Sequence, residues 1–260
     1  MIFSNKSDVT LVITCCGRID LLKQTLDSFF QFNTYPIKKV IITEDSGNEA
    51  AYSVIPDEKK EFFTIIVNKK NIGQIKSIDK AYAMVDTDYI FHCEEDWHFY
   101  RKKFIEDSKA ILEADSHVYQ VRLRSFYHDI AKEYPFHSLG KEIKASNVIA
   151  YQLLSSKEKW QGFSFNPGLR RLSDYLEINN GYSSFLEKEK QAINVESALS
   201  KHMKNLGRYV AILENDATAH IGYEQHIASR KEKKKKFKKN TCILALAFSL
   251  FILGWLAAKL

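Results

Sequence analysis

Cysteine is scarce in this chain, and its arrangement excludes two classes of small cross-linked fold. The 260 residues hold four cysteines, with no CxxC pair and no histidine at a matching spacing. This pattern predicts neither a disulfide framework nor a structural zinc site. A reducing compartment fits it best. The composition, 45% hydrophobic and 27% charged, is that of an ordinary globular protein.

No signal peptide is expected from the N-terminal residues, and the one long apolar run lies at the other end of the sequence. The first residues, MIFSNKSDVT, lack a basic stretch followed by an apolar segment. From Thr241 to Ala258 the chain is almost wholly apolar. About 18 residues with a rise of roughly 1.5 Å each are just long enough to cross the hydrocarbon core of a bilayer. We therefore expect residues 241–260 to form a transmembrane anchor; the alternatives are a buried C-terminal helix, or a basic run before it that binds nucleic acid.

Excess positive charge is confined to one segment. Residues 230–240, RKEKKKKFKKN, hold eight basic side chains and one acidic side chain, whereas the net charge of the whole chain is +6. The rest of the chain is therefore close to neutral, which argues against a nucleic-acid-binding body. A basic run beside an apolar run follows the positive-inside rule. It predicts a juxtamembrane linker at residues 229–240 and a folded domain at residues 1–228 that faces the cytosol.

Strands and helices alternate through the first half of the chain. Short apolar runs indicate buried strands, and apolar residues three and four positions apart indicate amphipathic helices. The expected strands are Val9–Thr14, Val40–Thr43, Phe62–Val67, Tyr89–Cys93 and Val118–Leu123. Helices are expected around Leu22–Phe30, Ile75–Val85 and Phe104–Leu112. This rhythm predicts an α/β fold with a mostly parallel sheet, which binds ligands at the carboxyl ends of its strands.

The second half is less regular. We expect a loop at Phe126–Pro135, a strand at Trp160–Asn166, a helix at Gly168–Ile178 and a last strand at Tyr209–Leu213. A further helix is expected to bury Val195, Leu199, Met203 and Leu206.

Three consecutive acids, Glu94, Glu95 and Asp96, directly follow the strand Tyr89–Cys93. Carboxylates crowded at the end of a buried strand repel one another unless a cation offsets their charge. Oxygen ligands suit Mg²⁺ or Mn²⁺, which can stabilise the charge that grows on a leaving diphosphate. The triplet therefore predicts a metal site, and a solvated acidic turn is the alternative.

Two weaker motifs lie at neighbouring positions of the expected sheet. In residues 43–47, TEDSG, a carboxylate at a strand end can accept a hydrogen bond from a nucleobase, and Ser-Gly permits a tight turn. Residues 71–76, NIGQIK, open a helix, and helix N-termini attract anions. Asn71 and Lys76 are therefore candidate residues for binding an anionic ligand. Each motif is also common as an ordinary turn or helix cap.

Together these motifs resemble a known family. The segments TLVITCCGRIDLLKQTLDSF, IITEDSG and NIGQIKSIDKAYAMVDTDYIFHCEEDW are similar to the nucleotide-binding half of GT-A-fold glycosyltransferases, which have a Rossmann-like sheet with flanking helices. They resemble the family-two inverting transferases and also the N-acetylglucosaminyltransferases that begin complex N-glycans. The resemblance implies that residues 1–115 bind a nucleotide-sugar, UDP-linked in those relatives, and that residues 116–228 bind the acceptor.

The resemblance also implies roles for single residues. Asp96 matches the last place of a DxD-like motif, the direct metal ligand, with Glu95 and Glu94 before it. Because these two are Glu rather than Asp, the preferred metal and the number of ligands stay open. Asp45 matches the aspartate that holds the uracil ring, and Thr14 lies where the family contacts the nucleoside.

Two further residues have competing interpretations. Arg18 could face the diphosphate or lie on the surface. His220 could complete the metal sphere or touch the phosphates, although a lone histidine is more often structural.

The catalytic base is expected in the second half. Inverting transferases of this fold use one carboxylate to deprotonate the acceptor hydroxyl. Residues 160–170, WQGFSFNPGLR, resemble the acceptor-side segment of the family, and Glu196 in the next helix stands where such enzymes place the base. Glu187 and Glu189 are the alternatives.

The sequence thus predicts a metal-dependent, inverting glycosyltransferase that moves a hexosyl or N-acetylhexosaminyl group to a membrane-associated or surface glycan. A sugar nucleotidyltransferase is one alternative, for which CCGRID is a poor phosphate-binding loop. A non-catalytic, membrane-tethered module that binds nucleotide-sugars is another.

Overall fold

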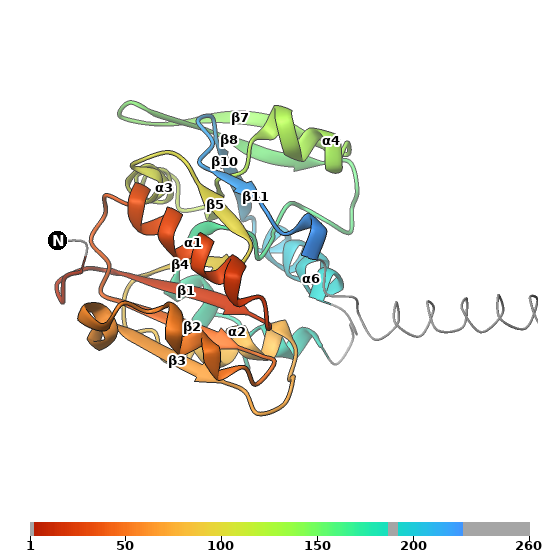
Figure 1. Cartoon of the computed structure of the whole chain (residues 1–260). Coiled ribbons are helices and arrows are strands. Elements are labelled where there is room, and N and C mark those ends of the chain that lie inside the picture. The colour runs from red at the N-terminus through yellow and green to blue at the C-terminus, as the bar shows by residue number, and fades with distance from the viewer. Residues whose placement is uncertain (1–2, 187–191, 226–260) are drawn as a thin grey trace, which may run out of the picture. The chain divides into compact units, whose positions relative to one another are not determined.

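The computed structural model describes residues 3–186 and 192–225 (Figure 1). Everything described up to Gly222 belongs to one compact unit, and a second unit begins at Tyr223. The strands are β1 Val9–Cys15, β2 Lys39–Glu44, β3 Phe63–Val67, β4 Tyr89–Glu94, β5 Trp97–Phe99, β6 Val118–Arg122, β7 His137–Ala145, β8 Val148–Ser155, β9 Gly168–Arg171, β10 Tyr209–Leu213 and β11 Thr218–His220. The helices are α1 Ile19–Phe32, α2 Gln74–Tyr82, α3 Phe104–Ala114, α4 Ala131–Glu133, α5 Leu172–Leu176 and α6 Ala192–Asn205. Short helical turns are η1 Glu49–Val54, η2 Asp57–Phe62, the π-helical η3 Phe126–Ile130, η4 Tyr182–Phe185 and η5 Tyr223–Gln225.

One large sheet organises the first unit. In the described residues it has nine strands, in the order β3-β2-β1-β4-β9-β6-β10-β8-β7. Strands β9 and β8 run antiparallel to both of their neighbours, so all the other strands point the same way. The carboxyl ends of β1, β2, β4, β6 and β10 therefore lie at one edge. A small antiparallel pair, β5 and β11, completes the strands.

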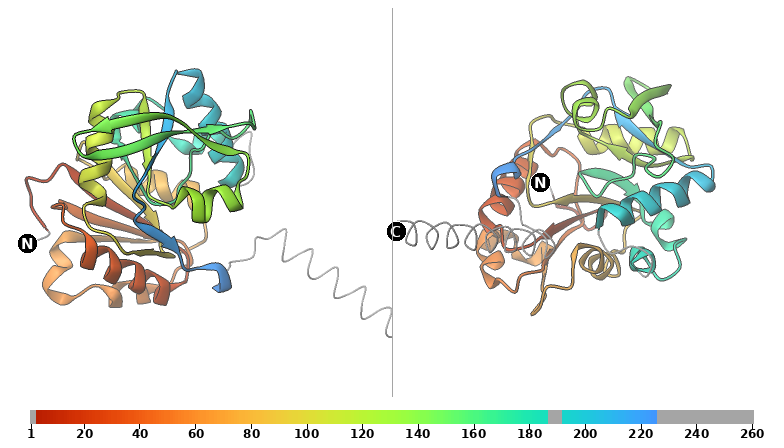
Figure 2. Two further views of the ribbon diagram at one scale, coloured as in Figure 1. Left: turned by 90° about the horizontal axis from the view of Figure 1, so that it is seen from above. Right: turned by 90° about the vertical axis from the view of Figure 1, so that its right-hand side faces the viewer.

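Both faces of this sheet are buried, and Figure 2 shows helices on both sides. Along β1, Leu11 and Ile13 pack in one core with Phe29 of α1, while Val12 packs in the other core with Ile78 of α2. Helix α3 belongs to the first core and α6 to the second. Burial on two faces explains why these strands are continuous apolar runs rather than alternating ones.

The expected elements of the first half are confirmed, as is the last strand, Tyr209–Leu213. Phe126–Pro135 is helical over η3 and α4 rather than a loop. The hydroxyl of Ser125 accepts a hydrogen bond from the backbone N–H of His128 and so caps η3. Leu206 lies beyond the end of α6 and is 51% exposed, so it does not belong to the buried face.

Two assignments between residues 160 and 178 are wrong because tertiary contacts override local pattern. Gly168–Arg171 is a strand paired with β4 and β6, and only residues 172–176 form the expected helix. A Cβ on Gly168 would lie 2.5 Å from the backbone oxygen of Val121, so this pairing needs glycine. Trp160–Asn166 is not a strand, because the N–H groups of Phe163 and Phe165 donate to the side chains of α6.

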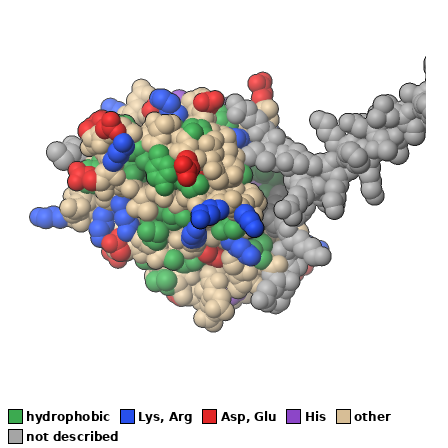
Figure 3. Space-filling model, turned by 60° about the horizontal axis from the view of Figure 1, so that its bottom comes forward, with side chains coloured by type: hydrophobic (Ala, Val, Ile, Leu, Met, Phe, Trp, Pro, Cys, Tyr) green, Lys and Arg blue, Asp and Glu red, His purple; other side chains and the backbone are tan. Residues whose placement is uncertain are grey.

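Some expectations lie outside the described residues: the linker at 229–240, the anchor at 241–260, and Glu187 and Glu189. Within the ranges that are described, no helix is long and apolar enough to cross a membrane. On the face of the molecule in Figure 3, acidic and basic side chains are interspersed, which agrees with the nearly neutral charge of residues 1–229.

Candidate active site

The candidate site lies at the edge of the sheet where β1, β2 and β4 end. Thr14 of β1 is aligned with Thr43 of β2 and with Glu94 of β4. Because parallel strands end at the same edge, the segments that follow them meet there. The backbone N–H of Cys16 donates to Glu95 Oε1 at 3.1 Å, which ties the first of these segments to the acid triplet.

Arg18 joins the second and third acids of the triplet. Its Nε lies 2.9 Å from Glu95 Oε1, and its Nη2 lies 2.8 Å from Asp96 Oδ2. The three side chains are only 17%, 5% and 7% exposed, so salt screens these ion pairs weakly. Arg18 therefore lies inside the site rather than on an exposed surface.

His220 reaches the same carboxylate from β11. Its Nε2 lies 3.0 Å from Asp96 Oδ2, and the pairing of β11 with β5 aligns it with Trp97. The chain then passes so close that a Cβ on Gly222 would lie 2.5 Å from Asp96 Oδ2. The end of β11 is thus fitted closely around Asp96, and the structure brings Arg18, Asp96 and His220 together.

The three acids differ in their readiness to ionise. Burial raises the pKa of Glu94, and the charge of Asp96 raises it further. Burial also raises the pKa of Glu95, against the opposing effect of Arg18. Burial likewise favours neutral Asp96, but the hydrogen bond from His220 and the charge of Arg18 outweigh it, so its pKa lies below the ordinary value. Negative charge is therefore most stable on Asp96.

The residues around Asp96 fit a divalent ion whose coordination sphere is completed by oxygen atoms of a bound substrate. No group of three or more His, Cys, Asp or Glu side chains converges on one point in the part of the chain that is described. Mg²⁺-type ions, however, are commonly held by one or two carboxylates together with substrate phosphates. Asp96, in contact with the imidazole of His220, would be one such carboxylate, and Glu94 and Glu95 precede it in the chain.

Asp45 organises the turn that opens α2. Its carboxylate accepts from the N–H groups of Ile72 at 2.9 Å and Gly73 at 2.8 Å, and its backbone oxygen accepts from the side chain of Asn71 at 3.1 Å. Gly73 has a φ of +90°, a conformation that favours glycine. The structure thus brings Asp45 and Asn71 together, while Lys76 is exposed in the first turn of α2.

Glu44, to which the sequence assigns no separate role, ties two turns together. Its buried carboxylate accepts from the N–H groups of Gly17 at 2.7 Å and Asn48 at 2.7 Å, and from both the N–H and the hydroxyl of Ser46. It therefore fixes the segment after β1 against the segment after β2. Only the position of Glu44 at a strand end indicated such a role.

Glu196 projects from α6 toward the loop at residues 160–167. Its Oε1 accepts from the N–H of Phe165 at 2.7 Å and from the hydroxyl of Ser164 at 3.1 Å. Burial raises the pKa of Glu196 to about 7, and the nearby charge of Glu94 contributes to the rise. A carboxylate with this pKa exchanges protons readily at neutral pH.

Asn166 connects the acid triplet to this loop, a role that the sequence reasoning missed. Its Nδ2 donates to Glu94 Oε2 at 3.2 Å, and its backbone N–H donates to the hydroxyl of Ser164 at 3.2 Å. Its Oδ1 accepts from Arg122 at 3.2 Å and from Arg124 at 3.0 Å. Glu94 and Glu196 are therefore linked through two residues of one loop.

The two arginines were also missed, although charged residues at the end of an apolar strand were a visible signal. Arg122 and Arg124 are 1% and 3% exposed. Arg124 forms ion pairs with Asp129 and Glu133. Burial lowers the pKa of Arg122 to about 10, with help from the charge of Arg124, so both remain cationic at neutral pH. They place positive charge beside the acidic site.

The family model described as "Glycosyl transferase family 2" matches residues 10–168, more than half of the chain. The chain belongs to glycosyl transferase family 2. The matched part of this family-2 glycosyltransferase contains the acid triplet and Asn166 but ends before Glu196 and His220. No curated protein matches the sequence.

Solved structures agree on the fold, which is of the GT-A type. A mannosyltransferase from Pyrobaculum calidifontis, in complex with GDP-Man and Mn²⁺, is 12% identical with a TM-score of 0.56, and the match covers 80% of this chain and 58% of that one. Residues 1–349 of S. aureus TarS in complex with UDP are 10% identical with a TM-score of 0.57, over 82% of this chain and 60% of that one. This family-2 chain therefore spans about three fifths of the length of these structures.

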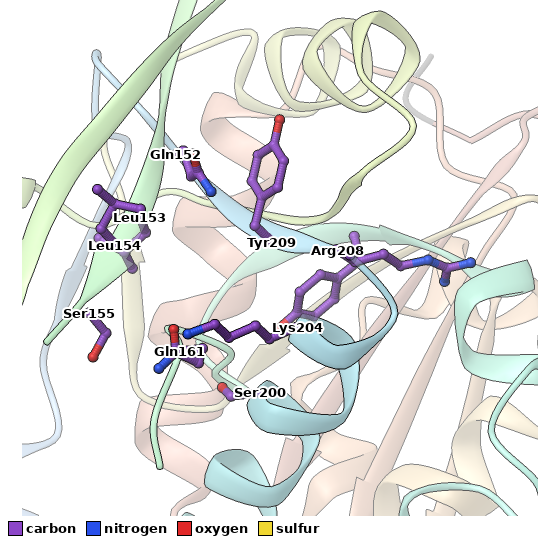
Figure 4. A pocket seen from close by; sticks show the side chains of 11 residues that line it. Gln152, Leu153, Leu154, Ser155, Gln161, Ser200, Lys204, Arg208 and Tyr209 are labelled. Atoms are coloured by element: carbon purple, nitrogen blue, oxygen red, sulfur yellow. The ribbon is translucent and has the colours of Figure 1, made fainter. Parts of the chain in front are cut away.

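A cavity with a volume of about 240 Å³ has none of the candidate site residues in its lining. Figure 4 shows the side chains that line it. Tyr209 and Arg208 at the start of β10, Ser155 at the end of β8 and Lys204 of α6 line it. Because β8 runs antiparallel to β10, these residues lie at the edge opposite the carboxyl ends. We therefore do not assign this cavity to the candidate active site.

Proposed function

We propose that this protein transfers a sugar from a nucleotide-sugar donor, UDP-linked, to the hydroxyl of a glycan, with inversion and with Mn²⁺ or Mg²⁺ as cofactor. The observation that carries the proposal is the connection of Glu94 to Glu196 through Asn166 and Ser164. It brings a carboxylate with a pKa of about 7 to the edge that holds the acid triplet. The mannosyltransferase and TarS structures, with GDP-Man and with UDP, support a nucleotide-linked donor.

The donor would lie across the ends of β1 and β2. The turn built by Asp45 and Asn71 offers a surface for the nucleoside, with Thr14 at the same edge. Arg18 and Lys76 supply positive charge for the diphosphate. A metal ion held by Asp96, with His220 and the neighbouring Glu94 and Glu95 as further candidate ligands, would stabilise charge on the diphosphate.

Glu196 would act as the general base. Its carboxylate takes the proton of the acceptor hydroxyl while the hydroxyl oxygen bonds to the anomeric carbon of the donor. The bond from that carbon to the diphosphate breaks, and its electron pair leaves with the nucleoside diphosphate. Attack from the face opposite the leaving group inverts the anomeric centre. The loop at residues 160–167 holds Glu196 in place through two hydrogen bonds, and such positioning is a large part of catalysis.

Donor binding tests the proposal directly. Among UDP-glucose, UDP-N-acetylglucosamine, UDP-galactose and GDP-mannose, we expect at least one, with Mn²⁺ and at about 100 times its Kd, to raise Tm by roughly 5–10 °C. The same donor should be slowly hydrolysed to free sugar and nucleoside diphosphate. Release of pyrophosphate in the presence of a sugar phosphate and UTP would instead indicate a nucleotidyltransferase, and no stabilisation by any donor would reject the proposal.

We further propose that residues 229–260 hold the protein on the cytosolic face of a membrane, beside a membrane-associated acceptor. The support is the sequence: an apolar run from Thr241 to Ala258 and eight basic side chains before it. Each basic residue near anionic headgroups contributes about 1 kcal/mol of attraction.

Truncation before Arg230 should separate anchoring from catalysis. The shortened protein should stay in the supernatant after centrifugation and still hydrolyse donor, because every candidate site residue precedes residue 221. The full chain should stay with membranes through high-salt and carbonate washes. Release of the full chain by salt alone would show that the lysines bind and the apolar run does not insert.

A further inference from the structure

A cavity of about 210 Å³ lies at the same edge of the sheet as the acid triplet. It is lined by the segment after β6, by the end of β10, and by side chains of the hairpin β7–β8. Figure 1 shows the ribbons of β7, β8 and β10 close to one another. Because β6 and β10 run parallel to β4, their carboxyl ends share its edge. The cavity is therefore on the side of the molecule where the candidate chemistry takes place.

The segments that line this cavity also build the active site. Arg124, directly before the lining residues Ser125 and Phe126, bonds Asn166, which in turn bonds Glu94. The chain after β10 lines the cavity as far as Asp216 and continues into β11, which ends at His220 beside Asp96. The segments that line the cavity therefore continue directly into the residues that contact Glu94 and Asp96.

The lining combines aromatic rings with two carboxylates that accept hydrogen bonds from tyrosine hydroxyls. Tyr127 is 70% exposed, and the ring of Phe126 lies nearly perpendicular to it with the ring centroids 5.2 Å apart. The hydroxyl of Tyr151 donates to Glu214 at 3.1 Å, and the hydroxyl of Tyr100 donates to Asp216 at 2.5 Å. An exposed ring offers a flat face to the C–H groups of a sugar, and carboxylates held in place accept from its hydroxyls.

The volume of the cavity and the charge of its lining residues limit the kinds of ligand that it can bind. The cavity is smaller than the roughly 300–1,000 Å³ of pockets for drug-sized molecules, so it suits a single ring. Glu214 and Asp216 would repel a phosphate or another anion. A nucleotide therefore does not fit, and an uncharged sugar ring does.

We propose that this cavity is an acceptor subsite, which binds a neutral sugar unit of the glycan next to the unit that carries the reacting hydroxyl. The inference rests on the proposed glycosyl transfer and deepens it. The enzyme would then recognise a chain of at least two sugars rather than a single terminal one. Tyr127 would supply the stacking face, and Glu214 and Asp216 would accept from the ring hydroxyls.

The test compares acceptors of one and two sugar units. The p-nitrophenyl glycosides of glucose and cellobiose, N-acetylglucosamine and chitobiose, and galactose and lactose form matched pairs. We expect the two-sugar member of one pair to have the lower KM. Tyr127→Ala should raise that KM about three- to tenfold, the effect of losing one aromatic contact, and so remove the advantage over the one-sugar member. Tyr52→Ala, at a 51% exposed tyrosine of η1, should leave both values unchanged.

Binding without turnover supplies the second measurement. Saturation-transfer NMR with the same glycosides should show contact to the second ring in the wild-type protein and a weaker signal in Tyr127→Ala. The subsite would be overturned if one-sugar and two-sugar acceptors had equal KM values and if the NMR signals were equal in the wild-type protein and in Tyr127→Ala. Donor hydrolysis in the same experiment would leave the proposed transferase intact. Glycoside binding that depends on Tyr127, without hydrolysis of any donor, would show that the cavity binds a sugar but would reject both the transferase and the role of the cavity as an acceptor subsite.

Discussion

Glu196→Gln should lower turnover by about 10²–10⁴-fold while donor binding survives. The amide keeps the shape of the side chain, and its oxygen can still accept from Phe165 and Ser164, but it cannot take a proton. The measurement is single-turnover transfer to the best acceptor, with UDP affinity measured by calorimetry. Glu113→Gln, at an exposed glutamate of α3, is the matched control and should transfer at the wild-type rate.

The pH dependence of the transfer rate tests the role of Glu196 as general base independently. Burial raises the pKa of Glu196 to about 7, and a base works only when it is deprotonated. The rate in the wild-type enzyme should therefore fall as pH drops below about 7. In Glu196→Gln this limb should be absent from the residual rate. Near-normal turnover in the variant would move the role of the base to Glu187 or Glu189, and an absence of turnover in both proteins would favour the binding module.

The fold of the first half was predictable because local and global signals agree there. The run Val9–Thr14 is apolar throughout, since both faces of β1 are buried, and its position fixed the edge at which the acid triplet lies. The spacing of Leu22, Leu26 and Phe29 defined α1 for the same reason. In these segments the pattern that packs the core is also the pattern that sets the secondary structure.

The loop at residues 160–167 shows why the second half was harder to predict. Its aromatic residues resemble a strand, yet its N–H groups bond to Ser200 and Glu196, which lie more than thirty residues away in sequence. No local pattern encodes such partners. Asn166 of the same loop bonds Glu94 and Ser164, and Ser164 bonds Glu196. The loop that was wrongly predicted as a strand therefore connects the acid triplet to Glu196.

Asp45, on the proposed donor side of the site, shows a different limit of prediction from sequence. Asp45 was singled out by a resemblance, as the residue that holds a uracil ring. In the structure its carboxylate holds the N–H groups of Ile72 and Gly73, so it shapes the turn on which a base would rest. The sequence predicted that Asp45 lies at the carboxyl end of a strand. It could not predict the hydrogen-bond partners of the Asp45 carboxylate, because these depend on the backbone conformation at Gly73.

Asp96→Asn should abolish metal-dependent transfer, with a loss of more than about 10²-fold, because it removes the most readily ionised acid of the triplet. The amide keeps the size of the side chain next to Gly222, so the fold should persist, but Tm should fall because the buried ion pair with Arg18 is lost. Asp27→Asn, at an exposed aspartate of α1, is the matched control.

Metal binding provides a readout that does not depend on turnover. In the wild-type protein, UDP should tighten the binding of Mn²⁺ followed by electron paramagnetic resonance, because one or two carboxylates and the diphosphate would share the ion. In Asp96→Asn this effect of UDP should disappear, since Arg18 would then face Glu95 and an uncharged amide. Two results would contradict the metal site: full transfer in excess chelator, or an affinity for Mn²⁺ that changes neither with UDP nor with Asp96→Asn. Either would mean that the acids serve only to anchor Arg18. In that case Arg18 itself would be the cation that faces the diphosphate, and Arg18→Gln should then cause the larger loss of activity.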